Sequence, residues 1–121
     1  MIFKAILLGV LQVTSYCPRP QETRPECKDR WHCTTANGDG ITMYGCAVSQ
    51  DYLRSGVIKY GDIIYVEKYG LRVVNDCLNA RYVHSVDLLV FEHWQEKAIG
   101  VRHLRVWVIS PSPKTEIAKR R

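Results

Sequence analysis

Two aspartates, Asp76 and Asp87, are the residues of this chain best suited to acid–base chemistry. Each lies beside an apolar run that is predicted to be a β-strand, Leu71–Asn75 before the first and Leu88–Phe91 after the second. Two carboxyl groups that rigid strands hold near each other can divide the work of proton transfer. A carboxyl pair of this kind is the usual equipment for cleaving a glycosidic bond.

The chain has 121 residues, which is the size of one compact domain. Its composition, with 46% hydrophobic and 24% charged residues, is that of a globular protein, and the sequence contains no evident repeat or low-complexity tract. We therefore expect a single domain over residues 1–110 and a flexible basic tail over residues 111–121.

The charge of the chain favours an anionic partner. Seventeen lysines and arginines against twelve acidic residues give a net charge of +5. Such a balance suits nucleic acid, an anionic lipid surface or an acidic polymer such as a bacterial cell wall. No base-reading motif accompanies the charge, so we predict no nucleic-acid partner.

An apolar run near the N-terminus predicts the first strand. Ala5–Leu11 is far shorter than the roughly 20 residues that an α-helix needs to span a bilayer. No small-residue cleavage site follows it. We interpret residues 5–16 as a buried strand, with a short export signal as the alternative, and we expect no stable membrane insertion.

The five cysteines leave at least one without a partner inside the chain, because their number is odd. Cys17, Cys27, His32 and Cys33 could be drawn as a zinc site, but their spacings match none of the usual paired-cysteine patterns. We therefore predict no metal site. A disulfide from Cys27 to Cys33 or to Cys17 and a set of reduced, packed thiols both remain open.

The remainder of the chain is predicted to alternate short strands with tight turns. Residues 17–44, rich in proline, glycine and charge, form a long loop. The turn signals Gly61-Asp62 and Tyr69-Gly70 bracket the first strand of a β-hairpin. A short helix runs from Glu92 to Ile99 and ends at Gly100. The expected strands in this part of the chain are residues 45–48, 63–67, 71–75, 87–91 and 104–109.

Two tryptophans are predicted to be core residues. Trp94 lies in the expected helix with Ala98, and Trp107 lies in the last strand. Ser49 is placed to cap a single helical turn. Many short strands, one short helix and a long loop predict a mainly β fold, a small closed barrel that has no exposed strand edge.

Four blocks of the chain carry a resemblance to a known family. They are Val13–Cys17, Thr35–Gly38, Gly45–Val48, and Tyr60–Asp76 followed by Asp87. Together they resemble the three-aspartate (3D) domain, which occurs in membrane-bound lytic transglycosylase A and in small muralytic proteins of bacteria and phages. The resemblance covers about residues 8–109. It implies a six-stranded double-psi β-barrel with one short helix and a long loop on the N-terminal side.

Two departures from the family pattern affect the predicted site. The first motif aspartate follows an Ala-Val pair in the family, but this chain has Ser49 there, with Asp51 as the candidate substitute. The glycine-rich stretch after the second aspartate is replaced by Cys77–Val83. A loop without those glycines must obtain positive φ from another residue, and Asn79 is the candidate.

The resemblance implies that Asp87 and Asp76 are the catalytic residues of a lytic transglycosylase. Its acid gives a proton to the oxygen between N-acetylmuramic acid and N-acetylglucosamine. The resulting carboxylate takes the proton of the sugar's own C6 hydroxyl, and the ring closes to a 1,6-anhydro product without cofactor or metal. Asp87 is expected to be this acid and base, with its pKa raised by burial or by the charge of Asp76.

Six further residues are predicted to contact the substrate: Thr14, Tyr16, Trp31, Thr35, Asn79 and His84. The resemblance places the first two in the family's substrate groove. Trp31 offers an aromatic face to a sugar ring, and a core-covering role is its alternative. His84, three residues before Asp87, could orient a carboxylate or the substrate, or could simply be solvated.

The implied partner is the glycan strand of peptidoglycan, on which the protein would act as a monomer in the periplasm or at the outer surface. A phage-encoded chain would be made in the host cytoplasm and released through a holin, as a small endolysin. Two alternatives stay open, a glycoside hydrolase and a non-catalytic barrel that binds glycan or forms part of a phage particle. When the resemblance is set aside, the pattern favours a structural role for both aspartates, each held by local backbone contacts.

Overall fold

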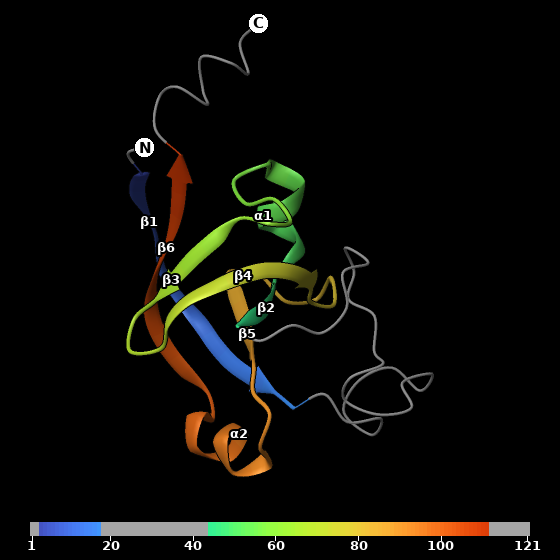
Figure 1. Cartoon of the computed structure of the whole chain (residues 1–121). Helices are drawn as coiled ribbons and strands as arrows, with labels where there is room; N and C mark the ends of the chain where they lie inside the picture. The colour runs from blue at the N-terminus through green and yellow to red at the C-terminus, as the bar shows by residue number, and fades with distance from the viewer. Residues whose placement is uncertain (1–2, 18–43, 112–121) are drawn as a thin grey trace, which may run out of the picture.

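The computed structural model of the chain describes residues 3–17 and 44–111 (Figure 1). Its elements, in chain order, are β1 (Phe3–Tyr16), β2 (Gly45–Val48), α1 (Gln50–Ser55), β3 (Ile63–Val66), β4 (Gly70–Cys77), β5 (Ser85–Leu89), α2 (His93–Ile99) and β6 (Arg102–Pro111). The predictions made for Trp31, Thr35, Cys27, Cys33 and the basic tail lie outside the described residues.

The six strands close into a barrel in the order β1-β5-β2-β4-β3-β6. The pairs β1 with β5 and β2 with β4 are parallel, and the other four pairs are antiparallel. If β1, β2 and β3 are exchanged with β4, β5 and β6 respectively, every strand keeps the same pairs of neighbours, so the barrel consists of two equivalent halves. In each half, a strand of the other half separates the first two strands, which is the interlocking of a double-psi barrel. The predicted mainly β, closed-barrel fold is confirmed, with two short helices in place of one.

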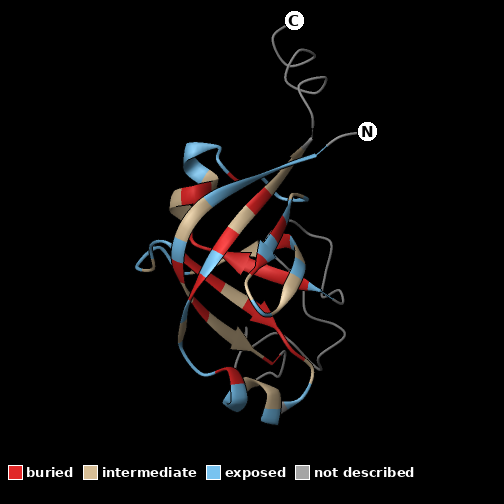
Figure 2. Cartoon of the chain, turned by 90° about the vertical axis from the view of Figure 1, so that its left-hand side faces the viewer, coloured by how far each residue is buried: buried red, intermediate tan, exposed pale blue. Residues whose placement is uncertain are grey.

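Alternation along the strands fills the barrel. β3 exposes Ile63 and Tyr65 and buries Ile64 and Val66, as expected of a strand with one face on a core. Figure 2 shows buried residues alternating with more exposed ones along much of the strands. The core includes eleven side chains with at most 1% exposure: Leu11, Val13, Cys46, Val48, Ile58, Ile64, Val66, Val74, Val86, Leu88 and Val106.

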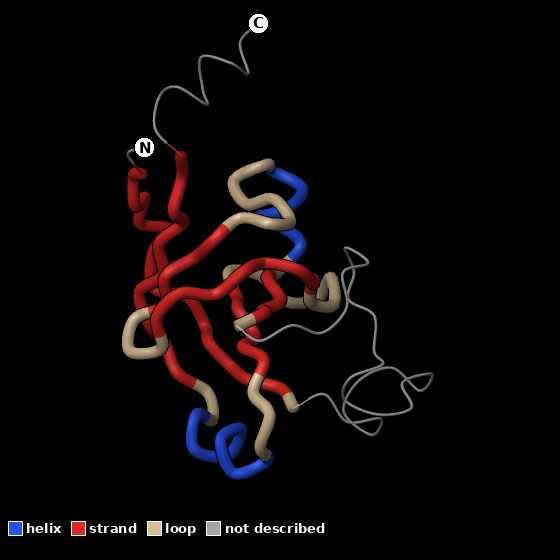
Figure 3. The backbone as a smooth tube through the Cα atoms, viewed as in Figure 1, coloured by secondary structure: helices blue, strands red, loops and turns tan. Residues whose placement is uncertain are grey.

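The predicted turns and the predicted helix end are present. β3 and β4 form the expected hairpin, with Gly70 at a φ of 86° where the second strand begins. Gly61 also has a positive φ, of 94°. α2 ends at Gly100, whose φ of 59° is in the region that favours glycine. Figure 3 shows α1 and α2 near opposite ends of the barrel.

The first strand is present but only its second half is buried, so the predicted buried strand over residues 5–16 is partly wrong. Phe3, Ile6, Leu7 and Val10 are 48–63% exposed, and burial begins at Leu11. The reason lies in the pairing. β6 accompanies the whole of β1, whereas β5 joins it only from Gln12 onward, so the start of β1 is an edge strand with one neighbour.

The core positions predicted for the tryptophans are also wrong. Trp94 is 67% exposed and Ala98 is exposed, because Gln95 fixes the rotation of α2. The Gln95 side chain accepts hydrogen bonds at Oε1 from the backbone N–H groups of Phe91 and Glu92. These bonds turn the Gln95 side of α2 toward the segment before the helix and leave Trp94 facing solvent. Trp107 is half-buried on the outer face of the barrel.

Candidate active site

Asp87 and Asp76 lie in one row across four strands. Thr14 on β1 pairs with Asp87 on β5, Asp87 pairs with Ala47 on β2, and Ala47 pairs with Asp76 on β4. Residues directly opposite each other in a sheet project from the same face, so the four side chains share one side. One intervening strand separates the aspartates, which puts their Cα atoms about 10 Å apart.

This row faces away from the barrel core and is nevertheless recessed. Its neighbours along the strands, Val13, Cys46, Val86 and Leu88, fill the interior, so the row must project outward. Ala47 is only 4% exposed and Asp87 is half-buried. The 4% exposure of Ala47 means that neighbouring groups cover the middle of the row, which accords with the burial that raises the pKa of Asp87.

A β-bulge gives Asp76 its place in the row. Cys46 pairs with Val74 and the next residue, Ala47, pairs with Asp76, so Asn75 is an extra residue in β4. Without the bulge, strict alternation after the buried Val74 would turn Asn75 outward and Asp76 into the core. The Asp76 carboxylate accepts a hydrogen bond from the backbone N–H of Cys77, at 2.9 Å.

The environment of Asp87 favours its protonated form. Burial raises the pKa of Asp87 to about 6, the Thr14 hydrogen bond lowers it, and the nearby charges of Glu96 and Asp76 raise it. The Thr14 hydroxyl donates to Oδ1 at 2.9 Å. The prediction of a raised pKa is confirmed, with burial as the main cause. A carboxyl group of this kind can give up a proton and take one back near neutral pH.

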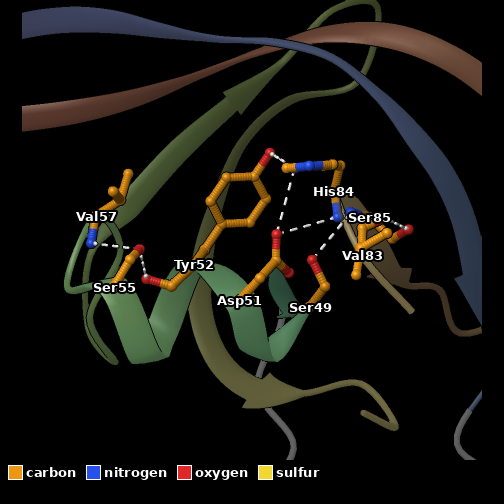
Figure 4. Close-up of polar contacts among 8 residues, drawn as sticks. All are labelled: Ser49, Asp51, Tyr52, Ser55, Val57, Val83, His84 and Ser85. Atoms are coloured by element: carbon orange, nitrogen blue, oxygen red, sulfur yellow. Dashed lines mark hydrogen bonds and ion pairs between the residues drawn. The ribbon is translucent and has the colours of Figure 1, made fainter. Parts of the chain in front are cut away.

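The start of α1 holds the loop that joins the two aspartate-bearing strands, residues 78–84. At one end of the loop, the Leu78 N–H donates to the Val48 carbonyl at 3.0 Å, and the Gln50 side chain donates to the Leu78 carbonyl at 2.9 Å. At the other end, the Ser85 N–H donates to the Ser49 hydroxyl at 3.0 Å (Figure 4). This segment therefore fixes where β4 ends and where β5 begins.

His84 is oriented by α1 and not by the aspartate row. Its backbone N–H donates to Asp51 Oδ2 at 3.3 Å, and its ring Nδ1 lies 3.3 Å from the same oxygen and 3.1 Å from Tyr52 Oη (Figure 4). The carboxylate beside His84 is thus that of Asp51 and not that of Asp87. His84 also supplies the positive φ, 48°, that was predicted for Asn79.

Asn79 is not in the left-handed region, so that prediction is wrong. Its Oδ1 accepts a hydrogen bond from the Arg81 N–H at 3.1 Å, and its carbonyl accepts one from Tyr82 at 3.0 Å. Asn79 thus closes an ordinary turn, which needs no positive φ at that position. It is exposed, and none of its recorded contacts reaches the aspartate row.

Asp51 does not take the place of the missing motif aspartate. Partial burial raises its pKa, but hydrogen bonds from Ser49 and from the His84 backbone outweigh this and hold the pKa below its usual value. Its carboxylate belongs to the contacts around His84. Ser49, at the motif position itself, is fully buried and satisfies the Ser85 N–H, which is a structural role. It begins α1 without a side-chain cap bond.

The structure therefore brings together three of the predicted site residues, Thr14, Asp76 and Asp87. Tyr16 lies two residues beyond Thr14 on the same side of β1, opposite Leu89. Sequence reasoning did not identify Ala47 or Glu96 as part of this site. Its place beside Val48 identifies Ala47 only as a strand residue. The position of Glu96 depends on the packing of α2 against β1, which is a tertiary contact.

The described cysteines show no metal site. Cys46 and Cys77 are free thiols, and the buried Cys17 donates a long hydrogen bond to the Phe91 carbonyl, at 3.6 Å. Burial raises the pKa of Cys46 to about 12, so this thiol stays protonated in the core. No group of three metal-binding side chains occurs within residues 3–17 and 44–111.

No family model matches the chain, and no curated protein sequence matches it either.

We predict that Asp87→Asn stabilises the protein at pH 7.5 and not at pH 4. The folded-state pKa of Asp87, about 6, lies above the ordinary value of 3.8. The contribution of this group to the free energy of unfolding is therefore fully present below pH 3.8 and is lost as pH rises through 6. The neutral amide removes that loss. The expected gain in unfolding free energy at pH 7.5 is roughly 1–3 kcal/mol, measured by urea denaturation at both pH values.

Asp51→Asn is the control of opposite sign, because the pKa of Asp51 is lowered in the folded protein. It should cost stability at pH 7.5 and should have little effect at low pH. An equal effect of Asp87→Asn at pH 4 and pH 7.5 would contradict the assignment of a raised pKa to this carboxyl group.

We also predict that Ser49→Ala destabilises the protein by about 1–3 kcal/mol, because the buried N–H of Ser85 would lose its acceptor. Ser55→Ala is the matched control on the same helix, since Ser55 is exposed and should cost less than about 0.5–1 kcal/mol. Urea denaturation measures both variants. Equal costs, or an unchanged amide hydrogen-exchange rate at Ser85 in Ser49→Ala, would refute the role of this hydroxyl.

Proposed function

We propose that this protein cleaves the glycan strands of bacterial peptidoglycan as a lytic transglycosylase, with Asp87 as the general acid and then the general base. The observation that carries the proposal is the half-buried carboxyl group of Asp87, whose pKa is raised to about 6 beside a second aspartate in the same row. The resemblance of the chain to the three-aspartate family supplies the substrate class.

The proposed reaction divides into two proton transfers. The Asp87 carboxyl protonates the oxygen between N-acetylmuramic acid and N-acetylglucosamine, and the bond from that oxygen to the muramic acid C1 breaks. The Asp87 carboxylate then removes the proton from the C6 hydroxyl of the muramic acid as its oxygen bonds to C1. Asp87 ends protonated, the product is the 1,6-anhydro sugar, and no water is consumed.

Asp76 would have two effects in this scheme. Its charge favours the protonated form of Asp87 before the first step. Its carboxylate, on the same side of the sheet as Asp87, would also stabilise the positive charge that develops at C1 as the bond breaks. Thr14 opposes the first effect, since its hydroxyl donates to the Asp87 carboxylate and so stabilises the ionised form.

A non-catalytic glycan-binding barrel is the second candidate, either free or as part of a phage particle. The observation that favours it is the fate of the first motif aspartate. Ser49 stands in its place, and Asp51 is engaged by His84. A barrel with an incomplete carboxyl set could bind glycan without cleaving it.

The cell wall is the proposed place of action. The net charge of +5 would attract the protein to an acidic wall polymer, and a phage-encoded chain would reach it through a holin. Within the described residues, no helix has the length and apolar character to cross a membrane.

We expect purified peptidoglycan treated with the wild-type protein to release soluble muropeptides with 1,6-anhydro ends, and Asp87→Asn to release none. Mass spectrometry of the soluble fragments measures both, and Asp62→Asn, on a turn outside the row, serves as the matched active control. Fragments with reducing ends would identify a hydrolase. No release from wild type, with the protein pelleting on the wall, would identify the binding module.

We predict that Thr14→Val moves the alkaline limb of the pH–activity profile upward. Activity requires protonated Asp87, so it should fall as pH rises through about 6. Loss of the Thr14 hydrogen bond raises that pKa, and the limb should shift by about 0.5–1 pH unit. Thr14→Ser keeps the hydroxyl and should keep the wild-type limb. A limb unmoved by Thr14→Val would show that another group controls it.

A further inference from the structure

The outer face of β4, β3, β6 and β1 is an apolar surface. Cross-strand pairing aligns two rows of outward side chains over these strands. One row is Val73, Ile63, Ile109 and Ala5, and the other is Leu71, Tyr65, Trp107 and Leu7. Several of these are freely accessible, with Leu71 at 55% and Leu7 at 53% exposure. A contiguous exposed apolar surface on a small protein often marks a binding site for a ligand or another protein.

This face has a hollow of about 460 Å³ at its β4 end. Its lining residues are Tyr44, Ile63, Tyr69, Leu71, Arg72 and Val73. Arg72 and Asp76 are four residues apart on β4, or about 13 Å along the strand, and neither aspartate of the candidate active site lines the hollow. The hollow is therefore a separate feature of the molecule, of a size that suits a small ligand.

Arg72 is the charged side chain of this hollow, and its charge is not neutralised. It is half-buried, and its NH1 group donates to the carbonyls of Tyr69 and Leu71 at 2.7 and 2.8 Å. Its guanidinium lies 5.5 Å from the centre of the Tyr44 ring. Its buried Nε has no acceptor among the described residues, and no Asp or Glu in that part of the chain forms an ion pair with it.

Arg105, on the outer face of β6, provides a comparison, although the cross-strand partner of Arg72 is the buried Ile64 and Arg72 therefore starts from the inner side of β4. Its guanidinium also lies 5.5 Å from an aromatic ring, that of Trp107, but Glu67 pairs with it at 2.9 Å. The charge of Arg105 is thus satisfied within the protein. Arg72 has the same aromatic contact without the carboxylate, and burial lowers its pKa, as expected of an uncompensated cation.

We propose that this hollow binds a small organic anion, a molecule with an aromatic or aliphatic body and one carboxylate or sulfonate group. The body would contact Leu71, Val73 and Tyr44. The acidic group would take the position relative to Arg72 that Glu67 takes relative to Arg105. Arg72 suits this role because NH1 is already bonded to two carbonyls, which holds the guanidinium in place, while NH2 can donate a charge-assisted hydrogen bond to the acidic group.

The test is a fluorescence titration of the full-length protein with 8-anilinonaphthalene-1-sulfonate, an aromatic anion that becomes fluorescent in apolar surroundings. Wild type should bind one molecule saturably. Arg72→Gln should weaken that binding about tenfold, as expected for a lost charge-assisted hydrogen bond. Arg105→Gln, the matched control, should leave the dissociation constant unchanged.

Competition isolates the requirement for an anion. 4-Phenylbutyrate should displace the probe, and 4-phenylbutanol, which has the same body without the charge, should do so at least tenfold less well. Leu71→Glu is the second variant, because an exposed carboxylate beside the hollow should repel the probe without removing Arg72. Unsaturable fluorescence, equal displacement by acid and alcohol, or wild-type affinity in both Arg72→Gln and Leu71→Glu would overturn the proposal.

Discussion

The pairing of β2 with β5 is the constraint on which the candidate active site depends. Val48 and Cys46 fill the core opposite Val86 and Leu88, so the residues between them, Ala47 and Asp87, must face outward. A slip of β5 by one residue would turn the Asp87 carboxyl into the barrel interior and expose Val86 and Leu88. Barrel closure removes the freedom to slip, because each of these strands is also paired in parallel on its other side.

The same constraint connects the fold to the chemistry of the row. Parallel pairing of β1 with β5 puts the Thr14 hydroxyl beside the Asp87 carboxyl, and the bulge in β4 completes the row with Asp76. The first turn of α1 then secures the loop between the two aspartate-bearing strands at both ends. Burial of Asp87, which raises its pKa, is thus a consequence of strand geometry. It costs stability at neutral pH, because the carboxyl group ionises there while it is still buried.

Much of the fold was predictable from local pattern, since alternation and turn residues report directly on a strand and its ends. The hairpin of β3 and β4, the end of α2 at Gly100 and the closed barrel all followed from such signals. Trp94 was misplaced because a seven-residue helix is oriented by its capping contacts and not by its apolar residues. The start of β1 was misplaced because an apolar run does not reveal how many neighbours its strand has.

For the site, the sequence by itself determined which groups were available: two aspartates at strand ends, a threonine on the first strand, and a serine in place of the first motif aspartate. Only the tertiary structure decided which of them meet. It placed Thr14 and Asp76 on either side of the Asp87–Ala47 pair, and it assigned His84 and Asp51 to each other. The physical reason is that strand register, the β4 bulge and the rotation of α1 depend on contacts between segments far apart in the chain, which local periodicity does not encode.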